Sequence, residues 1–109
     1  MSGSRTAAQY VLDVLGAGSG FELGRFFGGW SLRYDGRQAG IVMDTVYVKV
    51  LPAHRDEWHA AGAHPFRYVR DHRTIYVEAY WSVPPEALDN PELLHTLLVT
   101  GRALLAPSA

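Results

Sequence analysis

The chain has 109 residues, 48% of them hydrophobic, and a formal net charge of −1 at pH 7. This size predicts a single domain over residues 1–109 with one hydrophobic core, and the lack of a basic excess argues against autonomous nucleic-acid binding. Because the chain has no cysteine, disulfides, thiolate catalysis and cysteine-ligated zinc are excluded. No apolar run approaches the roughly 20 residues that cross a bilayer, so we expect a cytoplasmic protein without a membrane partner.

A short amphipathic helix is predicted over residues 4–15, because its apolar side chains recur every three to four positions. Ser4 is its candidate N-cap. Gly16, Gly18 and Gly20 end the helix in a flexible connection. This connection lacks the preceding strand and the Lys-Ser/Thr pair that a phosphate-binding P-loop requires, so we interpret it as a linker.

From Phe26 the hydrophobic pattern changes to a period of two, which is typical of half-buried strands. Asp35-Gly36 is a strong hairpin signal, because glycine accepts a positive φ without steric cost, and Asp44-Thr45 marks a second tight turn. The region from Phe26 to Leu51 is therefore predicted to form three antiparallel strands in a meander.

The glycine pair Gly28-Gly29 raises the question of a dinucleotide-binding loop. In such a loop the glycines follow a strand and open a helix whose N-terminus meets the pyrophosphate. The residues after Gly29 instead have the pattern of a strand. We therefore interpret the pair as structural: it allows a bulge or a close backbone approach where the strand begins.

The second half of the chain predicts a helix and then another hairpin. Pro52 suits the first position of a helix that Gly62 ends, with Trp58 as its buried anchor. Residues 66–70 and 74–83 have the pattern of the two hairpin strands.

The last predicted element is a helix with clear boundaries. Pro84 and Pro85 end the hairpin, and Asn90 is a good N-cap with Pro91 in the first helical position. An apolar stripe follows at Leu94, Leu97, Leu98, Leu104 and Leu105. The element order α-βββ-α-ββ-α predicts an α+β fold of two layers, in which an antiparallel sheet of about five strands carries helices on one face.

The polar residues form no recognisable catalytic or metal-binding motif. His54, His59 and His64 recur every five residues, a spacing that turns side chains about 140° apart on a helix. Asp71-His72-Arg73 is interpreted as a charged hairpin tip, and no serine or threonine lies in a nucleophile elbow. We expect no catalytic, cofactor-binding or metal-binding residue and no cofactor.

Aromatic residues in the strands are the more informative feature. The alternation over residues 74–83 predicts that two tyrosines share one face of the sheet, opposite an apolar face. A sheet that helices cover on one side leaves the other side exposed, and tyrosine suits a protein interface. We therefore expect a surface for a protein partner or a homodimer. Its candidate residues are Arg33, Lys49, Tyr76, Glu78 and Tyr80.

Three segments carry a resemblance to a known family: RFFGGWSLRYDGRQAGIVMDTVYVKV, AAGAHPFRYVR and YWSVPPEALDNPELL. Their order and local signatures resemble the N-terminal domain of the TfoX/Sxy family, bacterial proteins linked to the regulation of competence genes. The resemblance spans roughly Phe21 to Leu105. Phe26 stands where the family more often has methionine, and longer members continue into a C-terminal domain, which we expect to be absent here.

The resemblance implies a TfoX N-terminal-like fold, a role in transcription and no catalytic residues. The leading hypothesis is a non-enzymatic interaction domain that acts through a protein partner. The alternative is a small ligand-binding or catalytic domain with a pocket between helix and sheet near Trp30, Trp58 and Trp81. A third hypothesis, direct DNA binding, is disfavoured by the charge balance.

Overall fold

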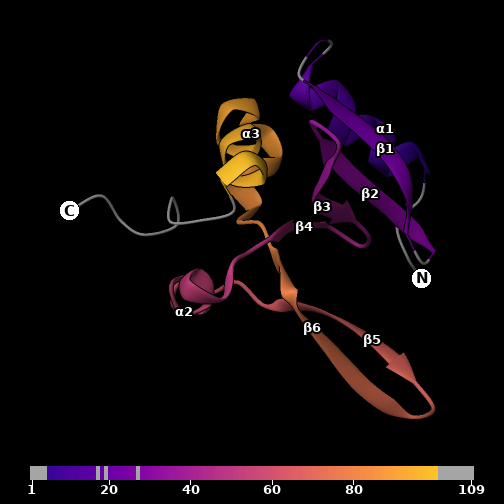
Figure 1. Cartoon of the computed structure of the whole chain (residues 1–109), viewed down its shortest axis with the longest axis vertical. Coiled ribbons are helices and arrows are strands. Elements are labelled where there is room, and N and C mark those ends of the chain that lie inside the picture. The colour runs from indigo at the N-terminus through magenta and orange to yellow at the C-terminus, as the bar shows by residue number, and fades with distance from the viewer. Residues whose placement is uncertain (1–4, 17, 19, 27, 101–109) are drawn as a thin grey trace.

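The computed structural model describes residues 5–16, 18, 20–26 and 28–100, which form an α+β fold of two layers. One layer is a six-stranded antiparallel sheet in the order β1-β2-β3-β4-β6-β5 (Figure 1). The strands are β1 (Phe21–Phe26), β2 (Gly29–Tyr34), β3 (Arg37–Val42), β4 (Val46–Lys49), β5 (Pro65–Arg70) and β6 (Arg73–Ser82). The helices are α1 (Arg5–Leu15), α2 (Arg55–Ala60) and α3 (Pro91–Thr100), with short 3₁₀ helices at Pro52–His54 and Pro85–Asp89. The predicted fold class and element order are confirmed, with six strands in place of about five.

The additional strand is β1, at one edge of the sheet. It pairs with β2 along its whole length, beginning with Phe21 opposite Tyr34. Phe21 and Leu23 contribute to the core while Glu22 is exposed, so the strand does alternate. The alternation of β1 is hard to see in the sequence, because the strand is short, follows several glycines and itself contains Gly24 and polar residues.

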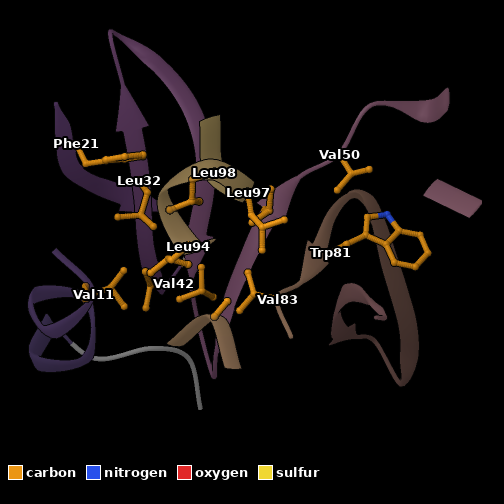
Figure 2. Close-up of a cluster of buried hydrophobic side chains, with 14 of the residues drawn as sticks. Val11, Phe21, Leu32, Val42, Val50, Trp81, Val83, Leu94, Leu97 and Leu98 are labelled. Atoms are coloured by element: carbon orange, nitrogen blue, oxygen red, sulfur yellow. The ribbon is translucent and has the colours of Figure 1, made fainter. Parts of the chain in front are cut away.

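The main hydrophobic core lies between the sheet and two helices. α1 packs against β1 and β2, and α3 packs against β3 and β4. Figure 2 shows the leucines of α3 beside Leu32 and Val42 of the sheet. Trp58 of α2 is fully buried in the same core, as predicted. None of the described helices is both long and apolar enough to cross a lipid bilayer.

The predicted signals at element ends are confirmed where the structure describes them. The N–H of Leu93 donates a hydrogen bond of 3.1 Å to Oδ1 of Asn90, which caps α3. Asp35 has a φ of 53° in the turn between β2 and β3, as a primed hairpin turn requires. The predictions for Ser4, Leu104 and Leu105 lie outside the described residues.

The interpretation of Gly28-Gly29 as structural is confirmed. Gly28 has a φ of +87°, a conformation that side chains disfavour. A Cβ on Gly29 would collide with Sδ of Met43 and would lie 2.7 Å from the carbonyl oxygen of Val42. The backbone therefore passes too close to β3 at this point for any residue but glycine.

A second hydrophobic cluster covers part of the sheet face away from α1 and α3. Its buried members are Ile41, Met43, Tyr47, Phe66 and Tyr80. Side chains of the strands themselves bury this face. The expectation that the face opposite the helices is left exposed is therefore wrong for the central strands.

Candidate protein interface

The outer half of the β5–β6 hairpin projects from the body of the molecule. Figure 1 shows this hairpin extending away from α1 and α3, beyond the part of the sheet that these helices cover. We call residues 67–76 the hairpin arm. Every residue of the arm except the half-buried Ile75 is exposed. An isolated two-stranded hairpin is only marginally stable in water, so such an arm is suited to contact with another molecule.

The hairpin arm exposes large apolar side chains on both of its faces. Val69 is 72% exposed and Tyr76 is 59% exposed, and both lie on one face because strand residues alternate. Tyr68, which is 40% exposed, lies on the other face opposite Ile75. Apolar surface of this kind commonly marks a protein contact.

Three arginines outweigh the single carboxylate of Asp71 and give the hairpin arm a net positive charge. Arg70 of β5 and Arg73 of β6 are directly opposite each other at the closing pair of the hairpin. Arg67 is also exposed, and no ion pair among the described residues involves any of the three. Two like charges in one cross-strand pair are mutually destabilising, so the tip of the arm is suited to a negatively charged partner.

The structure separates the tyrosines that the sequence placed on one face. Tyr76 and Glu78 are exposed, but Tyr80 is only 9% exposed and packs in the second cluster beside Val77 and Ala79. Val77 lies on the face opposite Tyr76, so the shared face predicted for Tyr76 and Tyr80 is wrong. Burial raises the pKa of the Tyr80 hydroxyl.

A register shift causes this separation. Pro65 pairs with Trp81, but the next residue, Phe66, pairs with Val77, so β6 has extra residues at this point. Nε1 of Trp81 donates a hydrogen bond of 2.8 Å to the carbonyl oxygen of Glu78 and spans the irregular segment. An irregularity of this kind reverses which residues face the core, and strict alternation in the sequence does not reveal it.

The other two candidate interface residues lie on other strands of the sheet. Lys49 is exposed and pairs with Tyr80 across β4 and β6. Arg33 is exposed on β2, where it pairs with Glu22 and Gln38, and β3 and β4 separate it from β6. The five candidates therefore do not form one continuous patch. An interface that includes them remains a prediction.

Sequence reasoning missed the residues that make the hairpin arm distinctive, namely Arg67, Tyr68, Val69, Arg70 and Arg73. A signal was present in the sequence. In β5, Arg67 shares a face with Val69, and Tyr68 shares the other face with Arg70, whereas a strand with one buried face places its apolar residues on that face and its polar residues on the other. The pattern of β5 indicates a hairpin that is exposed on both faces.

The tryptophans of the alternative hypothesis lie in different surroundings. Trp58 and Trp81 are buried in the main core. The half-buried ring of Trp30 lies 5.6 Å and 5.5 Å from the guanidinium carbons of Arg5 and Arg25. Two surface cavities are lined by other residues.

One of these cavities, of about 400 Å³, has polar residues in its wall, including His64, Ser82 and Glu86. The Oγ of Ser82 accepts a hydrogen bond of 3.0 Å from the backbone N–H of His64. The imidazole of His64 instead lies edge-on to the ring of Tyr47, with the centroids 5.8 Å apart. Among the described residues no base hydrogen-bonds to the Ser82 hydroxyl, whereas a catalytic serine has a base within hydrogen-bond reach.

The histidines of the repeated spacing lie in different surroundings. Nδ1 of His54 is 3.2 Å from Oε1 of Glu57. The ring of His59 packs at 6.3 Å from that of Trp81, and His64 packs on Tyr47. Over residues 5–16, 18, 20–26 and 28–100, no three potential metal ligands of the His, Cys, Asp or Glu type come together.

Comparison with protein families gave one finding. The sequence model of the TfoX N-terminal domain matches residues 14–102. Comparison with curated proteins and with solved structures each gave no significant match.

Proposed function

Because the chain belongs to the TfoX N-terminal domain family, we propose that it is a non-enzymatic regulatory domain that acts on transcription through a protein partner. The family's link with competence genes supports a role in gene regulation. The net charge of −1 disfavours direct DNA binding as the means. Contact with a protein of the transcription machinery is therefore the mode of action that we propose.

The observation that carries this proposal is the exposed apolar surface of the hairpin arm. Val69 and Tyr76 are exposed on the hairpin arm, which extends away from α1 and α3 (Figure 1). Burial of such side chains in a partner stabilises a complex by roughly 25 cal/mol per Å² of apolar area. Tyrosine also combines a large apolar ring with a hydroxyl that can remain hydrogen-bonded at the rim.

Site-specific photo-crosslinking in the native host tests the proposal. A photoreactive phenylalanine analogue replaces Tyr76 in the hairpin arm and, in a control protein, Tyr10, an equally exposed residue of α1. We expect a crosslink to a transcription protein from position 76 and a much weaker one from position 10. Absence of any product from position 76, or equal products from both positions, would contradict the proposal.

A transcript measurement provides the functional readout. Deletion of the gene is expected to change the abundance of a defined set of transcripts, which the wild-type chain restores. A chain with Val69→Asp and Tyr76→Asp should fold, because both side chains are exposed, but should fail to restore them. Full restoration by this variant would argue against the hairpin arm as the acting surface.

A further inference from the structure

We propose that the open edge of β5 binds an extended acidic segment of a partner protein, which joins the sheet as a further strand beside β5. This inference rests on the proposed function, and it adds the chemistry and the conformation of the partner segment. The position of β5 at the end of the strand order β1-β2-β3-β4-β6-β5 leaves one of its edges unpaired within the sheet.

The hairpin register determines which backbone groups of β5 point outward. Arg70 and Arg73 flank the two-residue turn, and the residues that flank such a turn exchange hydrogen bonds with each other. Because hydrogen-bonded and non-hydrogen-bonded pairs alternate, Arg67 and Val69 direct their N–H and C=O groups away from β6. These groups are the donors and acceptors that an added strand requires.

The positive charge of the hairpin arm indicates that the partner segment that pairs with β5 is acidic. Arg67 and Arg70 lie on opposite faces of β5. A strand added beside β5 would therefore have one arginine next to each of its faces. Neither arginine is in an ion pair within the described part of the chain, and Arg73 adds a third positive charge opposite Arg70. Asp71 in the turn offsets one of the three charges, so the arm remains positive. An acidic residue on each face of the incoming strand would relieve this repulsion.

The spacing of the arginines predicts a pattern for the partner. Residues opposite Arg67 and Arg70 are three positions apart in the incoming strand, and the two residues between them face Tyr68 and Val69. β-Branched or aromatic residues pack best against these exposed side chains. The partner segment therefore has two acidic residues that flank two β-branched or aromatic ones.

A second copy of this chain fits the edge less well. Two β5 strands would bring Arg67, Arg70 and Arg73 of both copies into one interface, which concentrates like charges. A duplex DNA fits less well because Val69, Tyr76 and Tyr68 are exposed apolar groups beside the arginines, and phosphates offer nothing to bury them.

Fluorescence anisotropy with short labelled peptides tests the inference on the full chain. One peptide carries two glutamates that flank two valines, and the control peptide carries two lysines in the same positions. We expect the glutamate peptide to bind at least about tenfold more tightly, which corresponds to two favourable charge pairs. Equal binding of the two peptides, or no binding of either, would overturn the proposal.

Reversal of the arginine charges distinguishes loss of binding at β5 from failure of the variant to fold. The chain with Arg67→Glu and Arg70→Glu should prefer the lysine peptide, a gain that an unfolded protein does not show. Arg37→Glu makes the same type of change at an exposed position of β3 and should keep the preference for glutamate. Loss of that preference in the Arg37→Glu chain would overturn the assignment to β5.

Hydrogen exchange identifies the mode of binding. The glutamate peptide should slow exchange of the amides of Arg67 and Val69, because an added strand accepts hydrogen bonds from them. Unchanged exchange at both amides would overturn strand addition. Concentration-dependent dimerisation that protects the same amides, or tighter binding of a random-sequence DNA duplex through the hairpin arm, would also overturn the proposal.

The two proposals fail in distinguishable ways. If position 76 crosslinks to a transcription protein but the peptides show no glutamate preference, the proposed function stands and the acidic strand is wrong. If the peptides behave as expected but position 76 gives no crosslink in the host, the edge binds acidic segments and the proposed regulatory function is wrong.

Discussion

The ring of Phe26 in β1 lies 5.9 Å from the ring of Tyr80 in β6, although β2, β3 and β4 lie between these strands in the sheet. Rings on strands so far apart can touch only if the sheet is strongly curled. The close passage of Gly29 over β3 is compatible with this curvature. The curl buries the second cluster without a covering helix and leaves the hairpin arm as the exposed part of the sheet.

Loss of either ring should therefore destabilise the fold. Tyr80→Ala is expected to lower the free energy of unfolding by about 3 kcal/mol, whereas Tyr76→Ala should change it by less than about 0.5 kcal/mol. Urea titration followed by fluorescence measures both values. A double-mutant cycle of Phe26→Ala and Tyr80→Ala should give a coupling of about 1 kcal/mol. Additive effects would show that the rings are not in contact.

The glycine at the start of β2 should not tolerate a side chain. Gly29→Ala is expected to lower the free energy of unfolding by more than about 1 kcal/mol, because its Cβ meets Met43 and the carbonyl oxygen of Val42. Thermal unfolding measures the loss, and ATP and NAD should not shift the transition of the wild-type protein. A variant of normal stability that loses a nucleotide-induced shift would reinstate the dinucleotide-binding interpretation.

The cap of α3 should contribute measurably to stability. Asn90→Ala removes the oxygen that accepts the N–H of Leu93, so we expect a loss of about 1 kcal/mol in the free energy of unfolding. Asn90→Asp keeps an acceptor at this position and should remain close to the wild type in urea titration. Equal losses in the two variants would indicate that the side-chain cap is not the cause.

Tyr47 should make the protein sensitive to alkaline pH. Burial, followed by its hydrogen bond to Asp44, raises the pKa of the Tyr47 hydroxyl. The folded state therefore retains a proton that the unfolded state releases near pH 10, and the stability that this group contributes is lost as the pH rises above about 10. Tyr47→Phe should reduce this loss in urea titrations across that range, and Tyr76→Phe at an exposed site should not. Equal pH slopes in all three proteins would contradict the assignment.

Much of the fold follows from local signals in the sequence. Asp35-Gly36 indicated its turn because few residues adopt positive φ easily, and Asn90 indicated the start of α3 because its side chain satisfies a free backbone donor. The burial of Trp58 was predicted because it is the large apolar side chain of the short helix between Pro52 and Gly62. Such signals depend on residues close together in the chain, so the sequence alone determines them.

The candidate surface depended on contacts between distant residues. The shift between Pro65 and Phe66 placed Tyr80 in the second cluster and left Tyr76 in solvent, although the two tyrosines have the same parity in the sequence. Register and curvature are set by how strands pack on one another, and the energies involved are shared among many side chains. The sequence therefore determined the elements other than β1, the family and the absence of thiol chemistry. Only the tertiary structure decided that the exposed surface is the hairpin arm.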